Sequence, residues 1–205
     1  MRTLVIDCAT EACSVALFDN DELMGSDYAV LGRGHAEALV PMIGRLPGRG
    51  QSDRIAVSLG PGSFTGVRVG VAAARALAFA WGAKLQGYTT LALVAAMARG
   101  IKGAVPLCVA MSGGHGEWFI QPFTTGGRSA EPLASLAPEA AAERGEQLIA
   151  GSVAERLVSL RGFGEGLFVL PDARSFGLLD ETWLMDEVRP LYGRAPDAKL
   201  PVSRP

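Results

Sequence analysis

The sequence has little histidine, little cysteine and little net charge. Its 205 residues include two histidines and three cysteines, and the net charge is −2. His35 and His115 alone cannot build a histidine-rich metal site. Cys8, Cys13 and Cys108 lie in apolar stretches, are odd in number and form no CxxC pair, which indicates buried, reduced thiols in a cytosolic protein. A disulfide scaffold is therefore excluded, and we expect no metal site.

Long apolar runs and basic stripes are also missing. The longest apolar candidate, 67–83, carries Arg75 in its middle and is shorter than the roughly 18 residues that cross a bilayer. The apolar run 4–6 ends at Asp7, so we expect no signal peptide. Because the arginines are scattered singly, the chain lacks the basic stripe of a protein that binds tRNA or DNA by itself. We expect a cytoplasmic protein without membrane contact, and any nucleic acid to be held by a partner.

What remains is the pattern of an α/β chain with two similar halves. Apolar residues make up 49% and charged residues 20%, close to the globular average. The first half predicts strands at 3–8 and 13–18 and then a third strand, a helix at 35–46 bent near Pro41, a strand at 55–59, a long helix ending near 81, a strand at 85–88 and a helix at 90–98. The second half predicts strands at 104–111 and 117–120, a helix at 138–144, a strand at 147–150, a helix at 153–160 and a strand at 167–170. We therefore predict a duplicated architecture with subdomains 1–102 and 103–205, and a surface tail after Gly193.

A glycine-rich turn, GPGSFTG at 60–66, lies between a predicted strand and the long helix, where free backbone N–H groups could hold an anion. It is not a P-loop, because no lysine follows before Lys84. It is not a dinucleotide fingerprint either, because the third glycine comes one position late and no acidic residue lies between 60 and 98. The favoured interpretation is a tight turn in which Ser63 or Thr65 caps the helix.

The long helix after this turn carries a small residue at every fourth position. We call this set the small-residue ridge: Gly66, Gly70, Ala74, Ala78 and Gly82. The other faces are also apolar and leave only Arg68 and Arg75 as charges, so the helix is expected to be buried on all sides. One face can pack on the chain's own sheet, and we expect the ridge to admit a second subunit. Ala74→Arg should then block that contact and leave the monomer folded. The alternative is that neighbours such as the helix at 90–98 cover it.

Three segments carry a family resemblance: 6–17, the Gly-His-Ala-Glu at 34–37, and 60–70. Together they resemble the TsaB (YeaZ-type) family, the accessory subunits of tRNA threonylcarbamoyladenosine biosynthesis. The match runs in register over roughly the first 100 residues and resumes faintly at 116–117, 190–192 and 199–201. The chain departs from many members at 112–115, where Ser-Gly-Gly-His replaces Asp-Ala-Arg and charge is lost from the domain cleft.

The resemblance implies the actin-like, Hsp70-like ATPase (ASKHA) fold with two βββαβα halves. It implies a cytoplasmic complex with a TsaD-like catalytic subunit and a TsaE-like ATPase, which transfers a threonylcarbamoyl group, supplied as an adenylate by TsaC, to the adenosine beside the tRNA anticodon. The family member itself is taken to be non-catalytic and without a cofactor, since the partners use the ATP and metal, and tRNA is reached through the complex. The helices at 35–46 and 65–81 form a four-helix contact with the partner, or with a second copy in a homodimer. The implied interface residues are His35, Leu39, Gly66, Arg68, Gly70, Ala74, Arg75 and Ala78.

Catalytic alternatives find little support. The HxxxH metal pair of TsaD-like enzymes would require a second histidine at position 39, which is Leu39, so metallopeptidase activity is not expected. Ser63 is not in a GxSxG turn. An ATP-dependent phosphotransferase of the same fold stays open as the second interpretation, with Asp7 for magnesium, although an aspartate there can equally cap the neighbouring turn. A homodimeric binding module is the third. The candidate anion or nucleotide contacts are Asp7, Thr10, Gly60, Gly62 and Ser63.

Overall fold

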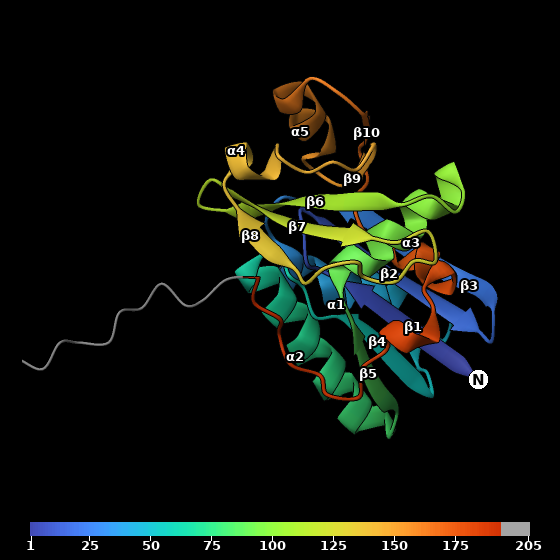
Figure 1. The fold of residues 1–205 in the computed structure, drawn as a ribbon. Helices are drawn as coiled ribbons and strands as arrows, with labels where there is room; N and C mark the ends of the chain where they lie inside the picture. The colour runs from blue at the N-terminus through green and yellow to red at the C-terminus, as the bar shows by residue number, and fades with distance from the viewer. Residues whose placement is uncertain (194–205) are drawn as a thin grey trace, which may run out of the picture.

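Two mixed β-sheets stand one above the other in the computed structural model, which describes residues 1–193 (Figure 1). The first sheet has the strand order β3-β2-β1-β4-β5. Its strands are β1 (Arg2–Asp7), β2 (Ala12–Asp19), β3 (Glu22–Val30), β4 (Arg54–Ser58) and β5 (Lys84–Tyr88). β1 to β3 form an antiparallel meander, and β4 and β5 continue from β1 in parallel. The predicted strand meander at the start of the chain is confirmed.

The second sheet repeats the first in the same order, β8-β7-β6-β9-β10. Its strands are β6 (Leu107–Gly114), β7 (Glu117–Phe123), β8 (Ala134–Leu136), β9 (Leu148–Ala150) and β10 (Glu165–Leu167). The three antiparallel strands are again followed by two parallel ones. The duplicated α/β architecture is therefore confirmed, although the last strand forms at 165–167 and not at 167–170.

The helices fill the layers around the two sheets, as Figure 1 shows. They are α1 (His35–Arg45), α2 (Phe64–Trp81), α3 (Thr90–Lys102), α4 (Pro138–Ala141) and α5 (Ala154–Arg161), with short 3-10 turns η1 (Pro47–Gly50), η2 (Ala173–Leu178) and η3 (Glu181–Trp183). The α1 and α2 helices cover one face of the first sheet, and α3 and η2 cover the other. The α3 helix also packs under the second sheet, whose far face carries α4 and α5.

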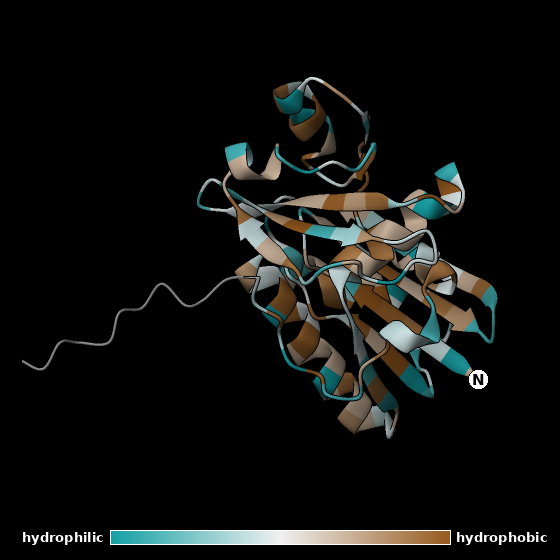
Figure 2. Ribbon diagram, in the orientation of Figure 1, coloured by the Kyte–Doolittle hydropathy of each residue, from teal (hydrophilic) through white to brown (hydrophobic). Residues whose placement is uncertain are grey.

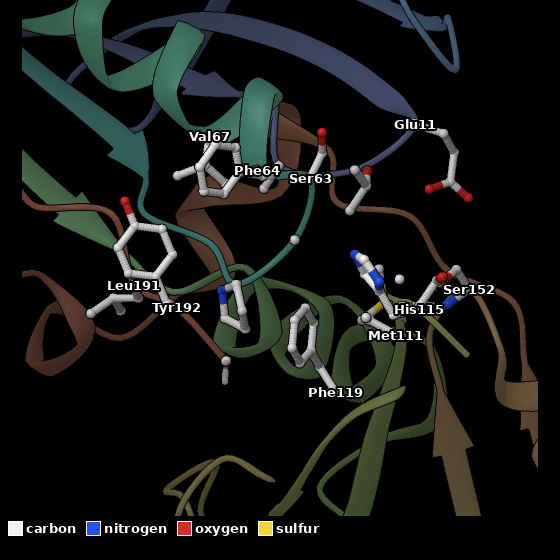
Figure 3. Close-up of a pocket in the computed structure, with 18 of the residues that line it drawn as sticks. Glu11, Ser63, Phe64, Val67, Met111, His115, Phe119, Ser152, Leu191 and Tyr192 are labelled. Atoms are coloured by element: carbon white, nitrogen blue, oxygen red, sulfur yellow. Dashed lines mark hydrogen bonds between the residues drawn. The ribbon is translucent and has the colours of Figure 1, made fainter. Parts of the chain in front are cut away.

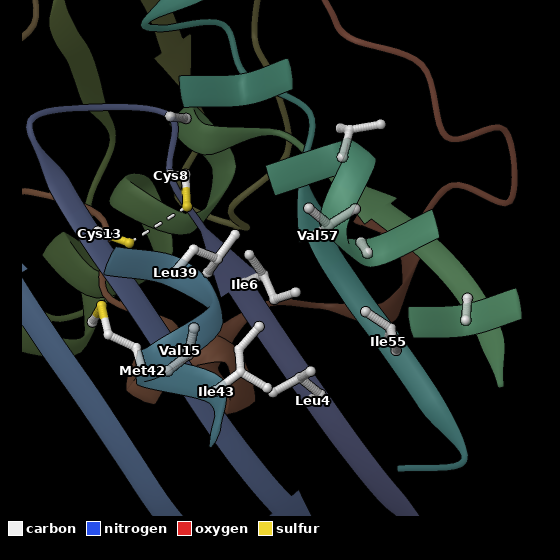
Figure 4. Close-up of a cluster of buried hydrophobic side chains, with 14 of the residues drawn as sticks. Leu4, Ile6, Cys8, Cys13, Val15, Leu39, Met42, Ile43, Ile55 and Val57 are labelled. Atoms are coloured by element: carbon white, nitrogen blue, oxygen red, sulfur yellow. Dashed lines mark hydrogen bonds between the residues drawn. The ribbon is translucent and has the colours of Figure 1, made fainter. Parts of the chain in front are cut away.

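Strand alternation explains why the first sheet is buried on both faces. Leu4 and Ile6 point toward α1 and α2 and join a core that includes Leu39 (Figure 4). Val5, between them, points the other way, toward Tyr88 and the η2 turn. Both faces of β1 are therefore apolar, which is why its sequence reads as a continuous hydrophobic run.

The end of the described chain returns to the first sheet. The η2 turn packs beside β1 and β2, and Met185 forms an isolated antiparallel bridge with Gly87 of β5. Farther on, the Leu191 N–H donates to the Leu59 carbonyl at 2.7 Å. The expected boundary at 102/103 coincides with the end of α3. However, Ala173, Phe176, Val188 and Leu191 of the second segment contact the first lobe, whereas Trp183 packs on Phe123 of the second sheet. The tail after Gly193 lies outside the described residues, and within 1–193 no helix has the length and hydropathy of a bilayer-spanning segment.

Candidate functional site

Four of the five residues of the small-residue ridge, Gly66, Gly70, Ala74 and Ala78, are buried within the chain, whereas Gly82 is exposed. A Cβ atom on Gly66 would lie 2.0 Å from the Cys8 carbonyl oxygen, and one on Gly70 would lie 3.6 Å from the Cys8 Cβ. Ala74 is fully buried against the same sheet. Small residues at this spacing let the α2 backbone approach β1 closely, so the close approach occurs within one chain. The prediction that the ridge admits a second subunit is wrong for these residues.

The other implied interface residues also make contacts within the chain. His35 is buried, with its Nε2 3.3 Å from the Ala12 carbonyl oxygen, and Leu39 is part of the core. Six of the eight implied residues are thus buried: His35, Leu39, Gly66, Gly70, Ala74 and Ala78. The remaining two bind within the chain, since Arg75 donates to the Val188 carbonyl at 2.6 Å and Arg68 donates to the Tyr192 hydroxyl. The sides of these helices that are turned away from the sheet are the ones exposed to solvent.

Those opposite sides form an apolar surface. Phe79 on α2 is 93% exposed and Val40 on α1 is 64% exposed. We define the outer helix face as seven exposed apolar residues of the two helices: Ala36, Val40, Gly44, Ala72, Ala76, Phe79 and Ala80. The charged residues Glu37, Arg45 and Arg75 of the same helices are exposed as well. Figure 2 shows hydrophobic colours along most of α2, on its outer side as well. The sequence did contain the signal for this surface, because α2 is apolar all round. It did not show which side faces outward.

A cavity of about 760 Å³ separates the two lobes near the start of α2 (Figure 3). One end is aromatic, with Phe64, Phe119 and Tyr192, and the other end is polar, with Glu11 and His115. The Arg68 guanidinium lies over the Phe64 ring, 3.3 Å from its centroid, and so closes the aromatic end. Most of these residues lie far apart in the sequence. The sequence analysis singled out segments that contain Glu11, Phe64, His115 and Tyr192, but it did not indicate that they meet around one cavity.

The glycine-rich turn forms one wall of this cavity. Ser63 Oγ accepts a hydrogen bond from the Gly66 N–H at 3.2 Å, so the capping interpretation is confirmed. The Ser63 N–H donates to the Ala9 carbonyl at 2.6 Å, and a Cβ on Gly62 would lie 1.8 Å from that oxygen. The glycines are therefore needed for backbone contact between this turn and the β1–β2 turn. Of the candidate anion contacts, Thr10, Gly62 and Ser63 line the cavity, whereas Gly60 is buried behind it.

Asp7 does not line the cavity. It is fully buried, and its carboxylate accepts from the Ala9 N–H at 2.9 Å and from the Tyr88 hydroxyl at 3.2 Å. Burial raises the pKa of this carboxyl to about 6, against the opposing effect of these hydrogen bonds. The contact with the Ala9 N–H confirms the capping role. Within residues 1–193, Glu11 is the one carboxylate that lines the cavity, and no cluster of three or more His, Cys, Asp or Glu could hold a metal.

The duplicated sheets, the cavity between them and the turn at the start of α2 define a two-lobed protein of the actin-like ATPase fold. Its fold is similar to that of the ethanolamine utilization protein EutJ from Carboxydothermus hydrogenoformans, with a TM-score of 0.50 at 12% identity over 88% of this chain and 90% of that one.

Closer relatives give the family. A family model described as TsaD, tRNA N6-adenosine threonylcarbamoyltransferase, matches residues 29–157. The chain is 36% identical over 157 residues to the tRNA threonylcarbamoyladenosine biosynthesis protein TsaB of Escherichia coli, covering 72% of this chain and 68% of that protein. The structure of YeaZ from Pseudomonas aeruginosa has a TM-score of 0.73 at 29% identity, covering 86% of this chain and 89% of that one. The chain belongs to the TsaB family.

Proposed function

We propose that this chain is an accessory subunit in tRNA threonylcarbamoyladenosine biosynthesis that binds a TsaD-like catalytic subunit through its outer helix face. The relatives' names support the process, and the match to the TsaD family model supports a partner of the same fold. A homologous partner would present an equivalent helix pair, and the two pairs would form a four-helix contact.

The observation that carries the proposal is an aromatic side chain exposed to solvent on the outer side of α2, one turn after the exposed Arg75. Phe79 is 93% exposed, and its neighbours on the same side of α2, Ala72, Ala76 and Ala80, are small and exposed. Burying one phenylalanine contributes about 1.5–3 kcal/mol, and anchors of this kind dominate interfaces. The small neighbours would let a partner helix approach closely enough to cover the ring.

The contacts of three polar side chains support a non-catalytic role for this subunit. His35 is buried against a backbone carbonyl, Ser63 Oγ is engaged as a helix cap, and Asp7 is engaged by Ala9 and Tyr88. These three side chains are engaged in contacts within the fold, which supports a structural role for them. In this proposal a TsaD-like subunit and a TsaE-like ATPase use the ATP and the metal, and the tRNA binds to these partners. The complex acts in the cytoplasm.

The test compares two single-residue variants in binding to a TsaD-like subunit. Phe79→Glu places a charge at the centre of the outer helix face, whereas Phe168→Glu changes a phenylalanine on the second lobe that is 55% exposed. We expect Phe79→Glu to weaken the complex at least about 100-fold in calorimetry, equivalent to about 2.7 kcal/mol, and Phe168→Glu to bind like the parent. Unchanged thermal midpoints would show that both variants fold. Tight binding by Phe79→Glu would refute the assigned interface.

The same surface allows a homodimer when no partner is present. An isologous contact would place the two Phe79 side chains near the symmetry axis. Sedimentation of the chain alone would detect it, and Phe79→Glu should shift the species to a monomer.

The phosphotransferase alternative has a separate test. Magnesium-dependent ATP binding by the isolated chain, with turnover lost in Asp7→Asn, would favour that alternative over the accessory role.

A further inference from the structure

Two cysteine side chains are in contact at the base of the β1–β2 turn. Cys8 directly follows β1, and Cys13 is the second residue of β2. Their sulfur atoms are 3.5 Å apart in the reduced protein, as the dashed line in Figure 4 marks. Cys8 is 2% exposed and Cys13 is fully buried. The close pair arises from the hairpin, because the sequence alone shows only two cysteines five residues apart.

The backbone already meets the requirements of a disulfide. The antiparallel register ends with Asp7 opposite Ser14, so the next facing pair is Cys8 and Cys13. Facing residues in an antiparallel pair have Cα atoms about 4.5–5.5 Å apart, and disulfides span about 4.4–6.8 Å. A bond of about 2.05 Å therefore needs a sulfur movement of roughly 1.5 Å. Rotation of the two side chains can supply most of it.

We propose that Cys8 and Cys13 form a reversible disulfide when the protein meets hydrogen peroxide, which makes the base of this hairpin an oxidative modification site. In the first step a sulfur attacks the peroxide, the O–O bond breaks, and a sulfenic acid and one water form. In the second step the other sulfur attacks the sulfenic sulfur, the S–S bond forms, and the hydroxyl leaves as a second water. The two thiols lose two electrons, the peroxide gains them, and both thiol protons end in water. A thiol reductant reverses the reaction by exchange.

The two sulfur atoms share one hydrogen bond in which either thiol can be the donor. A thiolate at either cysteine would have its reaction partner already in contact. Cys108 provides an internal comparison, because it is equally buried and burial raises the pKa of its thiol to about 12.

The turn enclosed by this pair supports both helices of the outer helix face. The Ala9 carbonyl accepts from the Ser63 N–H at the start of α2, and the Ala12 carbonyl is 3.3 Å from His35 at the start of α1. Oxidation would therefore act at the point where both helices begin. This inference does not rest on the proposed function, since disulfide formation can be measured on the chain alone.

The experiment treats the folded full-length chain with hydrogen peroxide, then denatures it in the presence of an alkylating agent and digests it with trypsin. Cleavage after Arg2, Arg33, Lys102 and Arg128 places Cys8 and Cys13 in one peptide, 3–33, and Cys108 in another, 103–128. We expect peptide 3–33 to be two hydrogen atoms lighter and unalkylated at both cysteines, while Cys108 stays alkylated. Treatment with dithiothreitol before alkylation should restore the thiols in peptide 3–33.

Two variants separate the steps. Cys8→Ser and Cys13→Ser should each leave one thiol that can form a sulfenic acid, which dimedone traps. Neither variant should give the lighter peptide. The proposal is overturned if both cysteines of the parent remain alkylated, or if they oxidise only when Cys108 does, because the latter would mean that unfolding exposes all three.

Discussion

Asp7→Asn is the substitution that tests the buried network at the end of β1 most directly. The parent carboxyl is fully buried and accepts hydrogen bonds from the Ala9 N–H and the Tyr88 hydroxyl. In the variant, the amide oxygen can accept from Ala9, and the amide NH₂ can donate to the Tyr88 hydroxyl, which is also within 3.2 Å of the Ile6 carbonyl. Asparagine thus keeps the geometry of the site and removes the ionisable proton.

The magnitude follows from the raised pKa of Asp7. Burial raises the pKa of Asp7 from its ordinary 3.8 to about 6. A pKa difference of one corresponds to about 1.4 kcal/mol, so ionisation of Asp7 destabilises the folded parent by about 3 kcal/mol. Between these two pH values the folded state binds more protons than the unfolded state, so the free energy of unfolding falls as pH rises. In the parent, protonated Asp7 therefore stabilises the folded state fully below about pH 4, and this part of the unfolding free energy is lost by about pH 7. Asp7→Asn does not show this loss.

Urea unfolding of the parent and Asp7→Asn at several values from pH 4 to pH 8 provides the measurement. We expect the difference in unfolding free energy between variant and parent to grow by about 3 kcal/mol, in favour of the variant, as pH rises across this range. Asp21→Asn, in the exposed turn after β2, serves as the control and should show no such trend. A difference that is constant with pH, or that changes in favour of the parent, would refute the assignment of a raised pKa to Asp7.

Further predictions concern the packing of the two helices. Gly66→Ala should lower the unfolding free energy by about 3 kcal/mol, because the new Cβ would lie 2.0 Å from the Cys8 carbonyl oxygen. Gly44→Ala, with no atom within 4 Å of the new Cβ, should raise it by about 0.5–1 kcal/mol in the same denaturation assay. Ala74→Arg should prevent folding, contrary to the expectation from the sequence, because Ala74 is fully buried; a cooperative thermal transition in that variant would contradict the packing.

Local sequence patterns were enough for most of the fold. Buried strands with apolar runs, helix-spaced residues and glycine turns gave the element order of both halves, since these signals depend only on neighbouring residues. The Ser63 cap and the Asp7 turn contact were predictable for the same reason, because each bond spans two or three residues. The β8 strand was missed, since its three residues are half-buried and carry no clear alternation.

The candidate site was less accessible to sequence reasoning. The α2 helix is apolar on every side, so its periodicity contains no contrast that distinguishes the inner face from the outer one. The cavity joins Glu11, His115 and Tyr192 from segments far apart in the chain, and the pairing of Cys8 with Cys13 depends on the register of the hairpin. Each of these features is a contact between segments that only folding brings together.

The sequence by itself determined the duplicated α/β fold, which follows from local residue spacing. It also determined the family, which is recognised from short contiguous segments such as the turn-helix motif. The tertiary structure decided which side of α2 is available to a partner. The side with glycines at 66 and 70 is the one whose backbone can approach the Cys8 carbonyl, so it packs inward and leaves Phe79 in solvent. It also decided that Asp7 is a buried, structural carboxyl, because Tyr88, eighty-one positions away, closes over it.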